Sequence, residues 1–312
     1  MKKFIYVCML SFILLFSGCA NKPEAQQSPN SEAPESEKTE NPEQENEDNR
    51  TNADTADTYS DILDISNPIT EDIDLSDKFR GIIGCAVIYD PSNDKYSLYN
   101  SSLCEQEASP YSTFKIISTL AGLKNGVIEN GASTMKYDGV QYPVSEWNKD
   151  LTLGEAFQIS CIWFFRQIID EVGSAEIQSE LQKMEYGNCD ISEWDGSGIN
   201  PMSDLNGFWL GASLKISPLE QVQVLKKIFE GESIYSDEHV AILKGIMLVS
   251  EDTRKIYGKT GSGSDGEAWF VGFTEENDTK KYFAVYLNDN TQPDKVSGSM
   301  AKEIALNILE SF

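Results

Sequence analysis

The chain changes in composition at about Thr58, and this change limits how much of it can fold. Residues 20–58 contain no aromatic side chain and consist mainly of Glu, Asn, Pro, Ser, Gln and Asp. They carry 11 acidic and 3 basic residues, so like charges extend the segment. Such a composition buries too little apolar surface to offset the entropy of ordering. We therefore expect a disordered acidic tether over residues 19–58 and a globular part over residues 59–312.

The first 18 residues have the pattern of a bacterial export signal. Lys2-Lys3 gives a positive start, and the apolar run over residues 4–16 is shorter than the roughly 20 residues of a membrane-spanning helix. Ser17-Gly18 before Cys19 resembles a lipobox, in which the cysteine is lipidated and becomes the mature N-terminus. We expect the protein to be exported and anchored through Cys19 to the outer face of the bacterial cell membrane. Phe16 is not the aliphatic residue usual at its position, which leaves plain secretion as the alternative.

The charge and the scarcity of metal-binding side chains narrow the class of partner. With 51 acidic against 25 basic residues the formal net charge is −26, which repels phosphate backbones, so we expect no nucleic-acid partner. A single histidine, His239, cannot build a histidine-rich zinc site. Four cysteines in the globular part would permit three pairings, but their spacing is not that of a metal site. We expect a monomer with small-molecule substrates, no metal, and free, mostly buried thiols at Cys85, Cys104, Cys161 and Cys189.

Residue patterns predict strands near both ends of the globular part and helices between them. The predicted strands cover residues 84–90 and 95–100, joined by a turn over 91–94, and residues 268–273 and 281–287. The predicted helices run from about Pro110 to Asn125-Gly126, and over residues 153–172, 219–229 and 301–309. This order indicates an α+β fold, in which an antiparallel sheet is built from both chain ends and flanked by helices, with an all-helical subdomain.

A serine and a lysine could act together at the start of the first long helix. Residues three apart face the same side of a helix, so Lys115 could take the proton that keeps Ser112 a poor nucleophile. Ser92 and Ser133 also have a lysine three residues later, but in turn-like contexts. Only Ser112 lies where unpaired helix N–H groups favour a developing negative charge. The alternative is an N-cap serine followed by a surface lysine.

Two further segments carry polar residues that could take part. Lys259-Thr260-Gly261 opens a strand-like stretch and supplies a positive charge, a hydroxyl donor and a glycine that lets a substrate approach. Taken alone, it is equally typical of a hairpin with a solvent-exposed lysine. Ser160 precedes an apolar run and alone would be a helix cap. In this order, however, S-x-x-K, a middle serine element and K-T-G form the signature of penicillin-recognising serine enzymes.

Five motifs resemble those of class D (oxacillinase-type) β-lactamases, which belong to the penicillin-recognising serine enzyme superfamily. They are Ser-Pro-Tyr-Ser-Thr-Phe-Lys at 109–115, Ser-Cys-Ile-Trp at 160–163, Tyr-Gly-Asn at 186–188, Phe-Trp-Leu at 208–210 and Lys-Thr-Gly at 259–261. The resemblance covers about residues 80–312. It implies hydrolysis of the β-lactam ring of penicillin-type antibiotics, and hence antibiotic resistance.

The resemblance also assigns the chemistry to three residues. It implies that Ser112 is acylated by the β-lactam, that Lys115 is the general base, and that Ser160 passes a proton to the leaving ring nitrogen. In that family the lysine works as its CO2 adduct, so CO2, held as a carbamate on Lys115 (N6-carboxylysine), is the only cofactor implied. The chemistry of lysine agrees, because desolvation favours the neutral amine and only that form reacts with CO2.

The remaining motif residues would bind the substrate or enclose the base. The resemblance implies that Trp209 holds the carbamate in an apolar pocket, and Ile162 would complete the lid. The backbone N–H groups of Ser112 and Ser262 would form the oxyanion hole, beside Lys259-Thr260-Gly261.

One departure from the family affects how the substrate carboxylate is held. Many members use an arginine near the segment that matches residues 290–300, where this chain has none. We expect Lys295, Ser262 or Thr260 to take that role.

Other functions share the fold and the three elements. A β-lactam sensor domain stays acylated and signals through transmembrane segments and a cytoplasmic effector, neither of which the sequence predicts. A sensor also resembles this chain less at the third residue of the middle motif, where a polar side chain disfavours the carbamate and this chain has Ile162. A cell-wall transpeptidase or carboxypeptidase usually carries Asn there. A non-catalytic binding protein is the last alternative. We expect the membrane-tethered serine β-lactamase.

Overall fold

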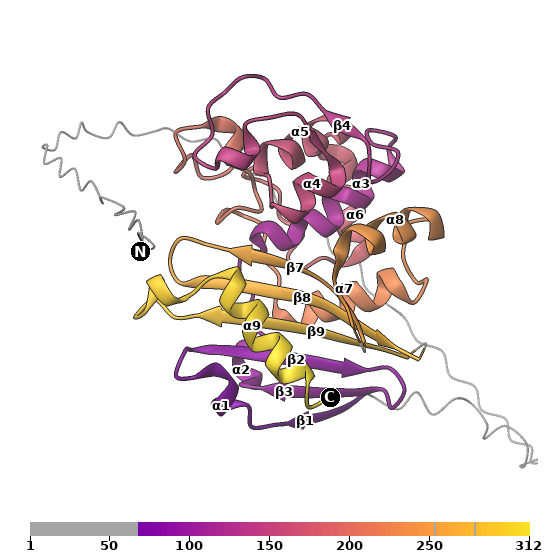
Figure 1. Ribbon diagram of the computed structural model, residues 1–312, viewed down its shortest axis with the longest axis vertical. Coiled ribbons are helices and arrows are strands. Elements are labelled where there is room, and N and C mark those ends of the chain that lie inside the picture. The colour runs from indigo at the N-terminus through magenta and orange to yellow at the C-terminus, as the bar shows by residue number, and fades with distance from the viewer. Residues whose placement is uncertain (1–67, 253, 278) are drawn as a thin grey trace, which may run out of the picture. The chain divides into compact units, whose positions relative to one another are not determined.

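The computed structural model describes residues 68–252, 254–277 and 279–312. The predicted export signal, the lipidation site Cys19 and the acidic tether therefore lie outside the described residues. Within them, the strands form one main sheet, and a largely helical region lies beyond one of its edges (Figure 1). In this part of the chain, no helix has the length and apolar character needed to cross a bilayer.

Most strands lie near the two ends of the described chain, and most helices lie between them. The strands are β1 (Ile69–Asp72), β2 (Gly84–Asp90), β3 (Lys95–Tyr99), β4 (Thr134–Met135), β5 (Leu151–Thr152), β6 (Leu248–Glu251), β7 (Lys255–Ser262), β8 (Glu267–Glu276) and β9 (Thr279–Asn288). The α-helices are α1 (Ser76–Phe79), α2 (Ser101–Cys104), α3 (Lys115–Lys124), α4 (Leu153–Gln158), α5 (Ile162–Val172), α6 (Ser174–Met184), α7 (Pro218–Phe229), α8 (Asp237–Met247) and α9 (Gly298–Leu309). Short 3-10 turns are η1 (Tyr111–Phe114), η2 (Ser145–Trp147), η3 (Ser203–Leu205) and η4 (Pro293–Lys295).

Strands from both ends of the described chain meet in the middle of the sheet. The strand order is β1-β3-β2-β9-β8-β7-β6, and β2 pairs antiparallel with β9, joining Gly84 to Leu287. This confirms the predicted α+β fold with a sheet built from both ends. One strand departs from the antiparallel pattern, because β1 runs parallel to β3 and makes the sheet mixed.

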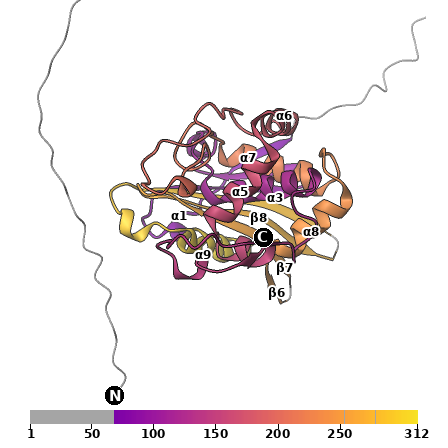
Figure 2. The same ribbon diagram turned by 90° about the horizontal axis from the view of Figure 1, so that it is seen from above.

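Alternating side chains divide the sheet's apolar residues between two clusters. On β2, Val87 and Tyr89 join the large cluster on the helical side, whereas Ala86 and Ile88 join a second cluster with α1 and α9. This is the period of two expected of a strand that is buried on both faces. Figures 1 and 2 accordingly show α7 on one side of the strands and α9 on the other. Helices thus flank both faces of the sheet, as predicted.

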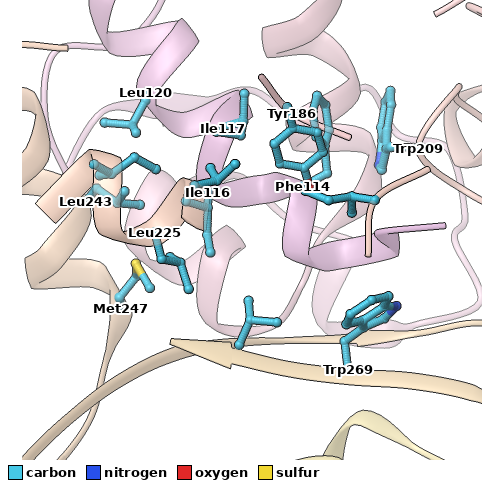
Figure 3. Packing of buried hydrophobic residues seen from close by; sticks show 14 of the residues in the cluster. Phe114, Ile116, Ile117, Leu120, Tyr186, Trp209, Leu225, Leu243, Met247 and Trp269 are labelled. Carbon is cyan, nitrogen blue, oxygen red and sulfur yellow. The ribbon is translucent and has the colours of Figure 1, made fainter. Parts of the chain in front are cut away.

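The helix α3 lies at the centre of the large cluster. Every residue from Lys115 to Leu123 is buried, so this helix has no solvent face and belongs to the core. Figure 3 shows apolar side chains gathered around it, among them Ile116, Ile117, Leu120, Leu225, Leu243 and Met247. The helix ends where predicted, since Asn125 is its C-cap and Gly126 has a left-handed φ of +71°. The fold therefore forces Lys115 into the core.

The prediction of one helix over residues 153–172 is wrong. Two helices, α4 and α5, occupy this stretch, and Ser160 between them has a left-handed φ of +55°. A residue in this conformation cannot continue a right-handed helix. Ser160 is therefore set in a corner between two helices.

Candidate active site

Ser112 and Lys115 form the first hydrogen-bonded pair of the site. Ser112 lies in η1 and Lys115 follows that turn as the first residue of α3. In a 3-10 turn the side chains at i and i+3 lie above one another, and Lys115 Nζ donates to Ser112 Oγ over 3.0 Å. The alternative of a surface lysine is wrong, because Lys115 is 0% exposed.

Burial changes the proton affinity of Lys115. It lowers the pKa of this lysine to about 7, because the ammonium form loses its solvation, and the nearby Cys161 thiol opposes this shift. The amine nitrogen lies 5.2 Å from the centre of the Phe165 ring, which cannot solvate it as water does. Near neutral pH the neutral amine, which can accept a proton, is therefore well populated.

Ser160 and Lys259 form a second pair. Lys259 extends from β7, and its Nζ hydrogen-bonds Ser160 Oγ in the corner between α4 and α5. This lysine is 4% exposed, and its Nζ lies 5.5 Å from the centre of the Phe157 ring. The pKa of Lys259 is lowered well below its usual value, first by burial and then by the charge of Lys115. The charge of Lys115 therefore disfavours the charged form of Lys259.

The strand β7 lies directly against the nucleophile. In the described sheet β6 pairs only with Lys255–Tyr257, so one edge of β7 has no strand partner over Gly258–Ser262. A Cβ added at Gly261 would lie 3.0 Å from Pro110 O and 3.4 Å from Ser112 N. A side chain at this position would push the nucleophile turn away. This edge can instead hydrogen-bond an extended substrate beside Ser112.

The three residues expected to hold a carboxylate differ in their surroundings. Thr260 is half-buried on β7, and Ser262 is exposed at its end. Ser262 Oγ accepts the N–H of Gly298, the first residue of α9, at 2.9 Å, which leaves the hydroxyl hydrogen of Ser262 free to donate. Lys295 is exposed in η4, where its Nζ donates to Gln292 Oε1 over 2.8 Å. Among the described residues, neither the Thr260 nor the Ser262 hydroxyl donates a hydrogen bond, so both can donate to a ligand beside β7.

Trp209 brings a buried polar group to the nucleophile segment. It is 1% exposed, and its ring stacks on Phe114 with centroids 5.6 Å apart, as Figure 3 shows. Its Nε1–H has no hydrogen-bond partner among the described residues. A buried donor without a partner is costly, so a ligand that supplies an acceptor here would be stabilised. Ile162, at the start of α5, is half-buried and packs against the same core.

None of the other S-x-x-K serines has a buried lysine three residues later; the third of them, Ser299 in the first turn of α9, precedes the half-buried Lys302. Ser92 Oγ donates to Asp90 Oδ1 within a turn, and Ser133 Oγ accepts the N–H of Glu129 at 2.9 Å. Lys136, three residues after Ser133, is exposed and pairs with Asp150. Ser112 is thus distinguished from these other matches by the burial of its lysine.

The cysteines of the described chain are free, as predicted. Three are buried and Cys189 is half-buried. Burial raises the pKa of the Cys161 thiol to about 12, so this neighbour of Lys115 is not a thiolate nucleophile at neutral pH. Among the residues with a described placement, no group of three or more His, Cys, Asp and Glu could hold a metal ion.

Sequence reasoning missed two residues beside the nucleophile. Tyr111 directly precedes Ser112, and its phenol donates to Glu267 Oε2 over 2.5 Å. The two residues lie 156 positions apart, so no local pattern shows their pairing. Tyr111 also has a left-handed backbone, with a φ of +47°. Tyrosine rarely adopts this conformation, so the sequence gives no sign of it.

Comparisons with known proteins point to one family. Residues 84–310 match the family described as the penicillin binding protein transpeptidase domain. The regulatory protein BlaR1 of Bacillus licheniformis is 35% identical over 239 residues, which are 75% of this chain and 37% of BlaR1. The probable β-lactamase YbxI of Bacillus subtilis is 32% identical over 243 residues, which are 77% of this chain and 85% of YbxI.

A solved structure extends the likeness to the fold. The crystal structure of a class D β-lactamase from Bacillus subtilis matches with a TM-score of 0.68 and 32% identity, covering 77% of this chain and 95% of that one. The chain thus spans most of the length of the β-lactamases that it matches, but only 37% of BlaR1.

Proposed function

The chain belongs to the family of penicillin-binding transpeptidase domains, in the group of the class D β-lactamases and their sensor relatives, and on this basis we propose that it hydrolyses the β-lactam ring of penicillin-type antibiotics. The observation that carries the proposal is the 3.0 Å contact between Ser112 Oγ and the amine of a fully buried lysine. Because burial lowers the pKa of Lys115 to about 7, its amine can take the serine's proton near neutral pH.

Acylation follows from the two serine–lysine pairs. Lys115 removes the proton from Ser112 Oγ, which attacks the carbonyl carbon of the β-lactam. The N–H groups of Ser112 and Ser262 stabilise the oxyanion that forms. When the ring C–N bond breaks, Ser160, held by its hydrogen bond with Lys259, passes the proton that Lys115 took from Ser112 to the ring nitrogen, so Lys115 is neutral again. The product is an ester on Ser112 with the ring opened.

Hydrolysis of the ester needs the same base. Lys115 takes a proton from a water molecule, the hydroxide attacks the ester carbon, and the proton returns to Ser112 Oγ as the acid is released. The buried, apolar surroundings of Lys115 keep its amine available for this second step.

The residues around Lys115 also fit the CO2 adduct that the resemblance implies. Burial supplies the neutral amine that CO2 requires, and the unpartnered Nε1–H of Trp209 is a buried donor for an anion. As a carbamate on Lys115, CO2 would supply an anionic base beside Ser112. Trp209 would donate to it, and Ile162 and Phe165 would exclude water.

We assign the substrate carboxylate to Thr260 and Ser262 rather than to Lys295. Both hydroxyls lie at the end of β7, and the hydroxyl hydrogen of Ser262 is free to donate. Lys295 is exposed and already donates to Gln292. A neutral hydroxyl binds a carboxylate more weakly than an arginine does, so we expect modest affinity.

Outside the described residues, we propose export and lipid anchoring through Cys19 to the outer face of the cell membrane. The support is the sequence alone: the positive start, the short apolar run and the small residues before the cysteine. The acidic segment after Cys19 would then separate the catalytic part from the membrane surface. We also propose that the catalytic part is monomeric.

The proposal is tested with the purified chain and penicillin. Mass spectrometry should find the antibiotic's mass on the peptide that contains Ser112, and absorbance should fall as the ring is opened over many turnovers. Ser112→Ala should lose both signals, whereas the matched control Ser133→Ala should keep both. Label retained in Ser112→Ala would refute the nucleophile assignment.

A β-lactam sensor is the second candidate, because BlaR1 is 35% identical over the matched region. The same experiment separates the two functions, since a sensor is acylated once and keeps the label, whereas a hydrolase releases product. A transpeptidase or carboxypeptidase would instead release D-alanine from a peptide that ends in D-Ala-D-Ala.

A further inference from the structure

Tyr111 holds an unfavourable backbone conformation immediately before the nucleophile. Its φ of +47° lies in the left-handed region, where the β-carbon of a bulky residue is crowded by the following carbonyl group. Such a conformation persists only where surrounding contacts over-determine it. The contacts of Tyr111 therefore decide how the next residue, Ser112, is presented.

Three contacts fix Tyr111 from different parts of the chain. Its backbone N–H donates to Trp209 O over 3.0 Å. Its phenol donates to Glu267 Oε2 over 2.5 Å. Its ring lies against Gly263, where an added Cβ would be 2.4 Å from Tyr111 Cζ. Gly263 directly follows Ser262, so the ring touches the end of the strand that faces the nucleophile.

Glu267 connects these parts. It is the first residue of β8, and its backbone carbonyl accepts the N–H of Gly263 at 2.8 Å, which closes the turn between β7 and β8. Its other carboxylate oxygen accepts a second phenol, from Tyr286 of β9, at 2.6 Å. One side chain thus joins the residue before the nucleophile, the turn after β7 and the interior of the sheet.

The two phenols that donate to this carboxylate come from different parts of the fold. Tyr286 is 1% exposed and packs against Trp269, deep in the sheet, so its hydroxyl ties Glu267 to the core. Of the two hydroxyls, only that of Tyr111 connects Glu267 to the nucleophile turn. A role limited to stability would make the two hydroxyls equivalent.

We propose that Glu267 is a positioning residue for acylation, which acts through the Tyr111 hydroxyl to keep Ser112 in register with the end of β7. The inference rests on the proposed acylation of Ser112 and adds the residues that set its geometry. Ser112 Oγ and N–H act on the substrate mainly in the transition state, whereas the edge of β7 binds it beforehand. Loss of the link should therefore lower the acylation rate constant and leave the affinity for the β-lactam nearly unchanged.

The test measures both quantities for the full chain by rapid mixing with a chromogenic cephalosporin. Tyr111→Phe and Glu267→Leu should each lower the acylation rate constant by about 10- to 100-fold, the range for small misplacements of a reacting group. The dissociation constant of the initial complex should change by less than about threefold. Glu267→Gln keeps an acceptor and should recover most of the rate. The matched control Tyr286→Phe removes the other hydroxyl from the same carboxylate and should acylate within about threefold of wild type.

A double variant gives the sharpest outcome. Tyr111→Phe combined with Glu267→Leu should acylate no more slowly than the slower single variant, because both changes break one link. Additive losses, an equal loss in Tyr286→Phe, or a change in affinity alone would overturn the inference. Thermal unfolding of each variant identifies any that fails to fold, in which case Glu267→Gln and Tyr111→Phe decide the question. If the wild type is acylated but not turned over, hydrolysis is refuted while the positioning inference is still measured.

Discussion

At the scale of single residues, two buried amines define the candidate site. Lys115 and Lys259 are both removed from water, and each hydrogen-bonds a serine hydroxyl but no carboxylate in the described chain. Burial lowers the pKa of both, and the charge of Lys115 lowers the pKa of Lys259 further. The site therefore holds proton acceptors at a pH where surface lysines are fully charged.

The pH dependence of acylation should report the ionisation of Lys115. Because its pKa is lowered to about 7, the neutral amine is lost as the pH falls, so in CO2-free buffer the acylation rate should fall about tenfold per unit below pH 7. The folded pKa lies below that of the unfolded chain. The contribution of Lys115 to stability therefore rises with pH from about 7 to 10.5 and is constant below 7. Acylation kinetics from pH 5.5 to 8.5 check this, and a flat profile would contradict it.

The unpartnered donor of Trp209 should matter for the CO2 adduct. Trp209→Phe keeps an aromatic ring on Phe114 but removes the Nε1–H, so the carbamate should form less completely and hydrolysis of the acyl-enzyme should slow by about tenfold or more. Added bicarbonate should raise wild-type turnover at low CO2 by mass action. Carbon-13 NMR with labelled bicarbonate measures the adduct directly. An equal carbamate signal in both proteins would rule out this role for Trp209.

At the scale of elements, a buried carboxylate secures the helix that carries Lys115. Glu180 of α6 is 0% exposed and accepts hydrogen bonds from Lys124 at 3.0 Å and Asn125 at 3.0 Å, both at the end of α3. Its second oxygen accepts the hydroxyl of Tyr235 at 2.9 Å, in the segment before α8. One side chain thus joins three parts of the helical region.

Removing this carboxylate should destabilise the protein strongly. Glu180→Ala removes a buried acceptor that three donors share and should lower the free energy of unfolding by about 3 kcal/mol. Glu176→Ala is the matched control, because Glu176 pairs with the same Lys124 nitrogen but is only half-buried, so its loss should matter far less. Denaturant unfolding compares the two variants, and equal losses would show that Glu180 is not a special anchor.

Elements with a clear residue pattern were predictable, and those set by distant contacts were not. The hairpin of β2 and β3 and the helices α3, α7 and α9 follow from alternation, helical periodicity and capping residues. The break at Ser160 has no glycine or proline to mark it, and apolar residues continue on both sides. The edge strand β1 is exposed on both faces and so shows no alternation. At the site, Ser112 and Lys115 are local neighbours, whereas Tyr111 and Glu267 meet only through the sheet.

At the scale of the whole molecule, the active-site pairs lie where the helical region meets the sheet. The Ser160–Lys259 pair joins the helical corner to β7, and η1 packs against the same strand. All the residues to which we give a catalytic role are therefore numbered above 68.

Anchoring should therefore be separable from catalysis. Cys19→Ser should move the protein from the membrane fraction to the medium, because it removes the proposed lipidation site. Penicillin hydrolysis per molecule should stay the same, since no proposed catalytic residue lies before Ser112. Fractionation and activity assays on both proteins check this. Equal release of wild type and variant would refute the anchor.

The pairing of β2 with β9 has a consequence for how the chain folds. These central strands join Gly84 to Leu287, so the sheet cannot close until nearly the whole domain has been synthesised. Contacts of such sequence separation slow folding, because a long loop must be ordered before they form. A chain that ends before β9 would expose the unpaired edge of β2 and tend to aggregate. Premature termination of translation before β9 should therefore be as damaging to folding as a mutation in the core.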